Sequence, residues 1–242
     1  MLSRDRDAFG QEMMEYYRTK EGFEIVERDD GFIDVSGTVG AYFREYKDWP
    51  LHERRSMRFA TGKVMDIGCG PGRHSLYLQR KGLYVLGIDN SPLAVEICRL
   101  RGLKHVKVMS LTQISSKLGT FDTILMMGNN FGLFGSPERA RRLLRRFKGM
   151  TSSDARIIAQ SHDIYNTTRR EHLAYHKMNR KRGRMAGQVR IRVRHLKCTG
   201  PWFDYLMVSK NEMEDILRGT GWRVDMFLDS GGPGYIAIIR KE

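Results

Sequence analysis

The sequence predicts an α/β protein with a doubly wound, parallel sheet. Apolar, strand-like runs alternate with helical segments of about ten residues between Lys63 and His162. The first of these runs leads directly into a glycine-rich turn, and two of the helices open with Ser-Pro. Such alternation is typical of βαβ units. Right-handed crossovers place the turns after the strands at one edge of the sheet, where ligands bind.

The individual elements follow from local signals. Strands are expected over residues 63–67, 83–89, 105–109, 121–128, 155–162, 222–228 and 235–241. Helices are expected over residues 73–82, 91–102, 136–150 and 209–221. Ser91 is a suitable cap with Pro92 at the first helical position, and Ser209 with Glu212 forms a capping box. These signals predict a core that extends over residues 61–163 and resumes over residues 209–242.

An inserted segment, residues 164–208, interrupts this pattern and is strongly basic. Between residues 166 and 200 there are 11 Lys and Arg residues against a single acid, Glu171, so this stretch holds +10 of the net charge of +14. In "QVRIRVRHL" (residues 188–196), Val189, Ile191 and Val193 alternate with arginines, which predicts a strand with one apolar face. We expect "WFDYLMV" (residues 202–208) to pair with it across a turn at residues 199–201.

Residues 1–60 are predicted to form an N-terminal helical flap. The stretch "AYFREYKDWPLHERRSMRFA" (residues 41–60) is expected to be helical on both sides of Pro50. It brings Tyr42, Phe43, Tyr46 and Trp49 just ahead of the first core strand. Two interpretations are open: these aromatic residues pack a helix on the sheet, or they cover the ligand crevice.

Composition excludes several classes of protein. Hydrophobic residues make up 40% and charged residues 29% of the chain, as in an ordinary globular protein. No apolar run approaches the roughly 20 residues of a membrane span, and the first residues are charged, so we expect a cytoplasmic protein without membrane partners. The three cysteines, Cys69, Cys98 and Cys198, form no CxxC pair, which argues against a disulfide framework and a metal site.

The motif "VMDIGCGPG" (residues 64–72) carries the chemistry. A strand, a glycine turn and a helix, followed by Asp89 at the end of the next strand, form a nucleotide-binding arrangement in which the carboxylate accepts both hydroxyls of a ribose. A dinucleotide fingerprint needs glycine where Arg73 stands, and Asp66 would repel a pyrophosphate. Asp66 suits an ammonium group instead. S-adenosylmethionine has both an amine and a ribose, and a Rossmann-type dinucleotide binder is the alternative.

These motifs, with "GID" and "FDTILMMGNN" (residues 121–130), resemble the class I S-adenosylmethionine-dependent methyltransferases. The resemblance covers residues 63–149 well and the last 35 residues, including "GTGW", more loosely. It implies an enzyme with S-adenosylmethionine as its cofactor and a seven-stranded, mostly parallel sheet whose last strand is antiparallel. The cofactor-binding residues that it implies are Asp66, Gly68, Cys69, Gly70, Gly72, Asp89, Asn90, Ser110, Leu111 and Gly128. Where many relatives have an acid after the third strand, this chain has Ser110.

Catalytic groups are expected beside the ends of the fourth and fifth strands. Asn129 follows the fourth strand and His162 ends the fifth. A histidine there can act as general base near neutral pH, or it can merely hydrogen-bond the loop. Tyr165, Asp204 and Tyr205 in the insertion are weaker candidates, and His74 is structural or adjacent to the cofactor.

Three interpretations of the function remain open, and the first two differ in the acceptor. In the first, residues 164–208 form a lid over a small-molecule acceptor, which an acidic compound would fit well. In the second, the same basic segment grips the phosphates of RNA or DNA. Against the second, the place after the fourth strand reads "GNNFGL" (residues 128–133), unlike the proline-containing run that the family's amine-methylating nucleic-acid enzymes have there. The third is a nonenzymatic regulator that binds S-adenosylmethionine or a nucleotide. Oligomeric state is not predicted.

Overall fold

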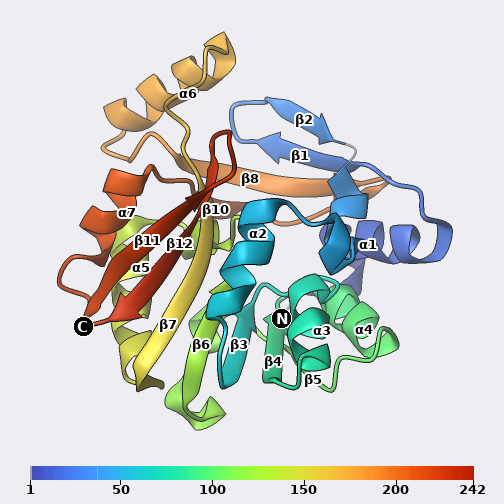
Figure 1. Cartoon of the computed structure of the whole chain (residues 1–242). Coiled ribbons are helices and arrows are strands. Elements are labelled where there is room, and N and C mark those ends of the chain that lie inside the picture. The colour runs from blue at the N-terminus through green and yellow to red at the C-terminus, as the bar shows by residue number, and fades with distance from the viewer. Residues whose placement is uncertain (1, 37) are drawn as a thin grey trace.

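The computed structural model describes residues 2–36 and 38–242, and a seven-stranded sheet forms its core (Figure 1). The strands lie in the order β5-β4-β3-β6-β7-β12-β11. Their bounds are β3 (Lys63–Ile67), β4 (Tyr84–Asp89), β5 (His105–Val108), β6 (Phe121–Met126), β7 (Thr151–His162), β11 (Trp222–Asp229) and β12 (Gly234–Lys241). β12 is antiparallel to β7 and β11, whereas the pairings among the other strands are parallel. The predicted fold class is confirmed.

Helices cover both faces of this sheet. They are α2 (Leu51–Ser56), α3 (Arg73–Arg80), α4 (Pro92–Leu100), α5 (Pro137–Lys148) and α7 (Lys210–Leu217). Two further helices lie apart from these faces (Figure 1): α1 (Ala8–Thr19), which packs on α4, and α6 (Arg170–Lys181). Along β3, Met65 and Ile67 pack into one apolar core with residues of α5 and α7. Val64 packs into a second core with Leu78 of α3 and with Trp49 and Met57, which flank α2. Burial on both faces explains why the core strands are continuous apolar runs in the sequence.

The predicted helix starts are confirmed. The Ser91 hydroxyl accepts a hydrogen bond from the Ala94 N–H, and Pro92 begins α4. Ser209 and Glu212 form the reciprocal capping box of α7. Among the described residues, no helix is both long and apolar enough to cross a bilayer.

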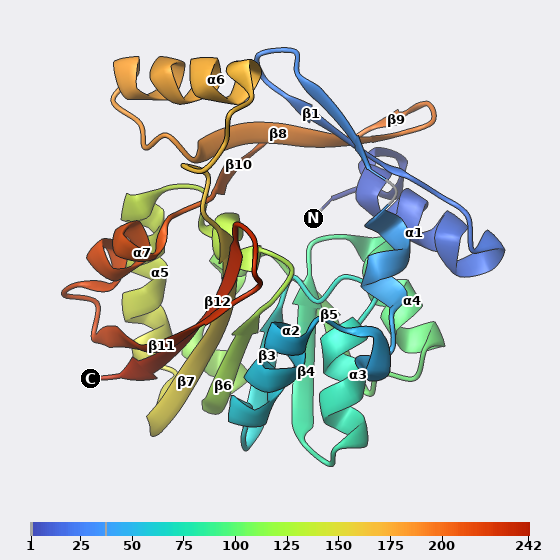
Figure 2. The same ribbon diagram turned by 45° about the horizontal axis from the view of Figure 1, so that its top comes forward.

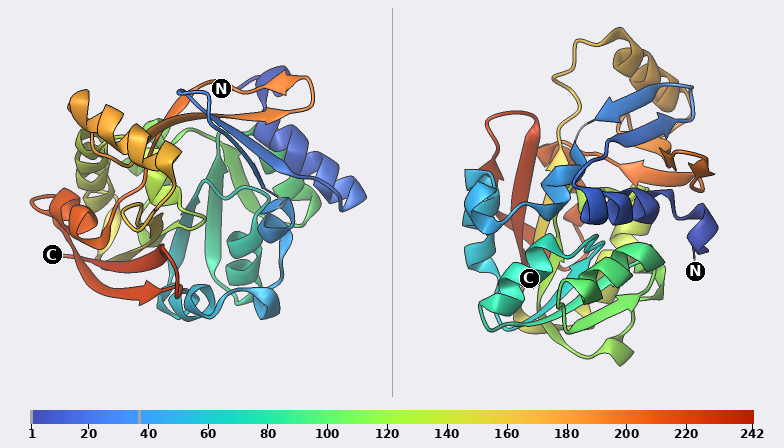
Figure 3. Two further views of the ribbon diagram at one scale, coloured as in Figure 1. Left: turned by 90° about the horizontal axis from the view of Figure 1, so that it is seen from above. Right: turned by 90° about the vertical axis from the view of Figure 1, so that its right-hand side faces the viewer.

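A second, smaller sheet lies across the carboxyl ends of the core strands (Figure 2). It contains β1 (Glu24–Arg28), β2 (Ile33–Ser36), β8 (Gln188–His195), β9 (Cys198–Thr199) and β10 (Phe203–Leu206). The order is β10-β8-β1-β2, and β9 pairs with the end of β8. Seen from above, α6 and α1 lie at opposite ends of this sheet (Figure 3). We call it the roof sheet. It confirms the strand predicted in the inserted segment.

Two predictions about the roof sheet are wrong. Residues 1–60 are not helical throughout, because β1 and β2 form a hairpin whose turn contains Gly31 at φ 88°. β8 has two edges, and β10 covers only one of them, so β1 pairs along the other. The tight turn after β8 also lies earlier than residues 199–201. It is formed by Leu196 and Lys197, because Cys198 already pairs with His195.

The aromatic residues ahead of β3 serve two purposes. The Tyr46 ring stacks on Tyr77 of α3, with 4.3 Å between the centroids, and Trp49 packs on the same tyrosine. Arg73 fixes this segment by donating to the Ala41 carbonyl at 2.8 Å. Tyr42, in contrast, lines the cavity described below. Both interpretations of this segment therefore apply, to different residues.

Candidate functional site

A cavity of about 1080 Å³ lies between the roof sheet and the carboxyl ends of the core strands. Its floor consists of the turns that follow β3, β4, β5, β6 and β7. Ten of the twelve predicted site residues line it: Gly68, Cys69, Gly70, Asp89, Asn90, Ser110, Leu111, Gly128, Asn129 and His162. Separate strand ends thus bring these residues into one chamber, as the parallel topology requires.

The glycine turn exposes its backbone to the cavity. The N–H groups of Gly68 and Cys69 both donate to the Ile88 carbonyl, at 2.8 and 3.1 Å. Gly68 has φ +69°, and a Cβ there would lie 2.6 Å from the Asn130 amide nitrogen. That amide nitrogen donates to the carbonyls of Ile67 and Gly68, at 2.9 and 2.8 Å. A side chain at position 68 would therefore break the contact that shapes the turn.

Asp89 is held in a defined position on the cavity wall. Its carboxylate accepts hydrogen bonds from the N–H groups of Gly70 and Ser91, both at 2.9 Å. Burial raises the pKa of Asp89 to about 6, and the bonds from Ser91 and Gly70 oppose this shift. The group is thus mostly ionised at pH 7 and can accept hydrogen bonds from hydroxyl groups.

Two predicted cofactor residues, Asp66 and Gly72, do not line the cavity. Side chains alternate along β3, so Asp66 points toward α3 and accepts a hydrogen bond from the Ser75 hydroxyl at 2.6 Å. It is 2% exposed, and burial raises its pKa to about 7. Gly72 caps α3 at φ 84°, where a Cβ would lie 3.0 Å from the Cys98 sulfur. Asp66 thus lies behind the turn and Gly72 at its end, and the expected contact of Asp66 with the methionine amine, directly or through water, stays a prediction.

Asn129 and His162 face the cavity beside the ends of β6 and β7. Asn129 has φ 62°; its carbonyl accepts a hydrogen bond from the Tyr205 hydroxyl at 2.5 Å, and its buried side-chain oxygen has no partner among the described residues. The His162 ring is half-buried and forms no hydrogen bond to any described residue. Burial lowers the pKa of His162, although Asp163 opposes this. The imidazole is therefore neutral at pH 7 and can accept a proton.

The roof sheet turns its apolar face inward. Val189, Ile191 and Val193 of β8 line the cavity. The arginines that alternate with them face outward, where Arg192 and Arg194 pair with Glu27 at 2.9 and 3.0 Å. The charge that stands out in the sequence therefore lies mostly on the far side of the roof from the site.

The weaker candidates have structural contacts. Tyr205 lines the cavity beside Asn129, and Tyr165 donates to the Glu212 carboxylate. The Asp204 carboxylate has one buried oxygen without a partner among the described residues. His74 lies 3.4 Å from Glu53, and burial lowers its pKa to about 4.

Four residues that the sequence did not single out also line the cavity: Asp7, Arg28, His172 and His176. Asp7 is fully buried and accepts hydrogen bonds from the Ser91 hydroxyl and the Leu93 N–H, at 2.8 and 3.1 Å. It thereby ties the N-terminal segment to the turn after β4. The spacing of the two histidines, four residues apart in a helical stretch, was the available signal for that pair.

Comparisons with known proteins agree with this geometry. A family model described as "Methyltransferase domain" matches residues 64–153. A ubiquinone biosynthesis O-methyltransferase of Xanthomonas oryzae pv. oryzae is 31% identical over 93 residues, which are 32% of this chain and 39% of that protein. The chain thus matches well under half the length of this curated relative.

Solved structures extend the similarity to the whole chain. An S-adenosylmethionine-dependent methyltransferase from Bacteroides fragilis, in complex with S-adenosyl-L-homocysteine, has a TM-score of 0.84 at 28% identity, with 100% of this chain and 97% of that chain covered. A Methanosarcina mazei methyltransferase shares the fold, with a TM-score of 0.59 at 19% identity over 76% of this chain and 95% of that chain. Residues 64–153 thus match the methyltransferase domain family, and the whole chain has the fold of an S-adenosylmethionine-dependent methyltransferase.

Proposed function

We propose that the protein is an enzyme that transfers the methyl group of S-adenosylmethionine to a small molecule held beneath the roof sheet. The cavity itself carries this proposal. Its volume of about 1080 Å³ exceeds what one drug-sized ligand needs, and it combines the cofactor turns with an apolar wall. The cytoplasmic location expected from the sequence is part of the same proposal.

The residues present fit the cofactor. The backbone of Gly68 and Gly70 would lie along its methionine and ribose portions, and Asp89 would accept the ribose hydroxyls. Asn90, Ser110 and Leu111 line the cavity where the adenine would be held. When bound, the cofactor supplies an activated methyl group on its sulfonium.

The protein positions the acceptor and manages its proton. Methyl transfer is an in-line displacement, so the acceptor atom has to face the methyl group from the opposite side to the leaving sulfur. The ends of β6 and β7 lie beside the cofactor turn, and His162 there is neutral and free to accept a proton. Asn129 offers, at the same place, a side-chain oxygen that has no partner within the described part of the chain.

Replacement of His162 by glutamine should lower kcat by a factor of about 10² to 10⁴, which is the range for loss of a general base. Because the pKa of His162 is lowered, the wild-type base is available throughout pH 7 to 9 and is lost only as the solution becomes acidic. A kcat profile between pH 5 and 9 measures this. His105→Gln is the control, since His105 is an exposed residue at the start of β5 and lies outside the cavity lining. Activity retained in His162→Gln over that range would exclude His162 as the base.

The relatives support a small acceptor without identifying it. The ubiquinone biosynthesis O-methyltransferase of Xanthomonas oryzae acts, by its name, in the synthesis of a small molecule. Its match covers only 32% of this chain and therefore does not extend to the whole roof of the cavity.

An RNA or DNA acceptor is the second candidate, because α6 and the outer face of β8 carry exposed basic residues such as Arg180 and Arg190. If the basic segment covered about five phosphates of a single strand, affinity would fall roughly a hundredfold between 50 and 200 mM salt. We expect fluorescence anisotropy to show no such binding, because Arg192 and Arg194 are already paired with Glu27. Tight binding with that salt dependence would favour the second candidate.

A further inference from the structure

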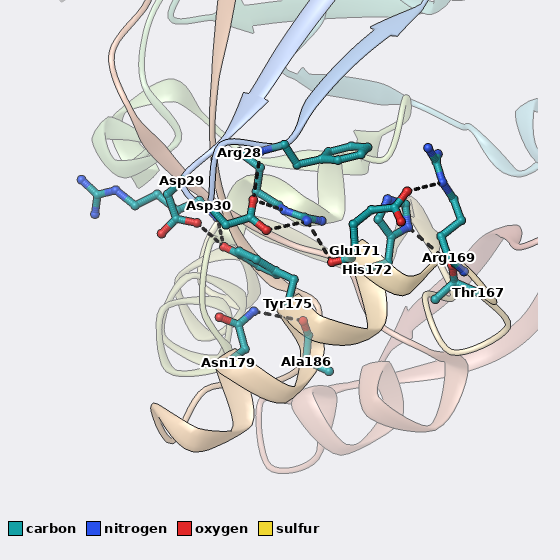
Figure 4. Close-up of polar contacts among 12 residues, drawn as sticks. Arg28, Asp29, Asp30, Thr167, Arg169, Glu171, His172, Tyr175, Asn179 and Ala186 are labelled. Atoms are coloured by element: carbon teal, nitrogen blue, oxygen red, sulfur yellow. Dashed lines mark hydrogen bonds and ion pairs between the residues drawn. The ribbon is translucent and has the colours of Figure 1, made fainter.

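At the end of the cavity next to α6, polar side chains form a wall that hydrogen bonds hold in place. Tyr175 donates from its hydroxyl to the Asp29 carboxylate at 2.6 Å, which ties α6 to the β1–β2 turn (Figure 4). Asn179 donates to the carbonyls of Ala186 and Gln188, at 3.1 and 2.8 Å. Helix, turn and roof strand are thus bound to one another, so groups on this wall are held in place before any ligand arrives.

Arg28 is the fixed cation of this wall. It is 8% exposed, and its guanidinium carbon lies 4.1 Å from the centroid of the Tyr175 ring and 4.8 Å from that of Phe32. Nε and Nη2 donate to the Asp30 carboxylate, at 2.8 and 2.7 Å, and Nη2 also donates to the Glu171 carbonyl. Nη1 makes no hydrogen bond to the described residues. One edge of the guanidinium therefore remains available to a ligand in the cavity that Arg28 lines.

His172 and His176 complete the wall from α6. They are four residues apart, which places them on the same face of the helix, and both line the cavity. His176 is 7% exposed, and neither of its ring nitrogens has a hydrogen-bond partner among the described residues. His172 contacts the Thr167 hydroxyl through Nδ1 at 3.4 Å, and its Nε2 makes no hydrogen bond to residues 2–36 or 38–242. Both imidazoles line the cavity and can therefore hydrogen-bond a ligand there.

Positive charge outweighs negative charge at His172. Burial lowers the pKa of His172 first, and the charges of Arg28 and Arg169 lower it further. Glu171 and Asp34 act in the opposite direction but have smaller effects. The imidazole is therefore neutral at pH 7 in surroundings that favour an anion.

The pKa of His176 is also lowered by burial and by nearby positive charge. Burial lowers its pKa, followed by the charges of Arg180, His172 and Arg28, whereas Glu212 of α7 raises it. The Tyr165 ring faces it with 6.2 Å between the centroids. An anion placed between the two imidazoles and Arg28 would favour their protonated forms, so its binding would draw protons from solution.

Resting on the proposed function, we propose that Arg28, His172 and His176 bind an oxyanion of the acceptor, such as a carboxylate, while the apolar face of β8 holds its hydrocarbon body. The acceptor is then an acidic small molecule. A neutral molecule of the same shape lacks the oxyanion that pairs with the free edge of Arg28. It therefore binds without the charged hydrogen bonds that an acidic acceptor makes. A cationic one is repelled.

The test compares three probes of similar size and different charge: benzoate, benzamide and benzylamine. Each is titrated calorimetrically into protein saturated with S-adenosylhomocysteine, in two buffers of different ionisation enthalpy. We expect benzoate to bind at least about tenfold more tightly than benzamide, with no binding of benzylamine. Benzoate binding should take up protons, and its affinity should fall as the pH rises from 6 to 8. Equal binding of benzamide or benzylamine, no benzoate binding, or no proton uptake would each overturn the proposal.

Variants of Arg28, His172 and His176 test whether these residues cause the preference for benzoate. Arg28→Gln should weaken benzoate binding by about tenfold or more. Because Arg28 also holds Asp30 and α6, the double variant His172→Gln/His176→Gln provides a second measure that leaves those contacts in place, and it should abolish proton uptake. Arg170→Gln is the control and should change nothing, because Arg170 is an exposed residue at the start of α6. Preference for benzoate that survives in both the Arg28 and the histidine variants contradicts the proposal.

Binding of S-adenosylhomocysteine is measured first in every variant. Its absence in the wild type would contradict the proposed function, and the three probes would then be compared on the free protein. The two proposals can therefore fail separately.

Discussion

Replacement of Asp89 by alanine should weaken S-adenosylmethionine binding by at least about a hundredfold. The carboxylate is expected to accept two ribose hydroxyls, and each hydrogen bond to a charged group contributes about 1.5–3 kcal/mol. Its position is fixed by the N–H groups of Gly70 and Ser91, which would also lose their acceptor. Isothermal calorimetry measures the change. Unchanged affinity would show that the ribose binds elsewhere.

The control for this variant is Asp122→Ala. Asp122 also accepts a backbone hydrogen bond, from the Lys63 N–H at 2.7 Å, but it lies outside the cavity lining. Cofactor affinity should be unaffected by its loss. Because the pKa of Asp89 is raised to about 6, wild-type affinity should also fall as the pH drops below 6, where the carboxyl takes up its proton. Asp89→Asn should not show this inflection.

Ile191→Glu should lower methyl transfer by at least about a hundredfold while leaving cofactor binding intact. Ile191 faces the cavity from β8, directly opposite Arg28, so a glutamate there replaces the apolar wall with a buried carboxylate and occupies the free edge of the Arg28 guanidinium. Arg190→Glu is the matched control, because Arg190 is the neighbouring residue on the same strand and is exposed. Transfer of labelled methyl from the cofactor to a metabolite extract provides the measurement. Equal losses in the two variants would contradict the assignment of the inner face of β8 to the acceptor.

The core could be predicted because its signals are local. The glycine turn, the Ser91 and Ser209 caps and the alternation of strand and helix each depend on a few neighbouring residues. Parallel topology then brings distant strand ends together without further information, which is why Asn129 and His162 were placed on the cavity correctly.

The roof could be predicted only in part, because its pairing is not local. β1 and β8 are separated by more than 150 residues, and nothing in either strand specifies the other. The hairpin signal in "EIVERDDGFIDV" (residues 24–35) was nevertheless available, since Asp-Gly between two alternating runs favours a tight turn. Arg28 on that hairpin was missed with it.

Asp66 shows a different limit of sequence patterns. Its position before the glycine turn suggested contact with a ligand, but a one-residue step along a strand reverses the face on which a side chain lies. The structure turns Asp66 toward Ser75. The basic run of β8 had the opposite outcome, since its predicted alternation is confirmed: the valines and the isoleucine face the cavity, and Arg192 and Arg194 pair with Glu27 on the other side.

A crystal structure of the protein with S-adenosylhomocysteine tests the central claim most directly. We predict density for the ligand in the cavity beneath the roof sheet, with its ribose hydroxyls on Asp89 and its adenine beside Ser110 and Leu111. The sulfur should face the chamber between His162 and the inner face of β8. Density outside this cavity, or a ribose away from Asp89, would contradict the account.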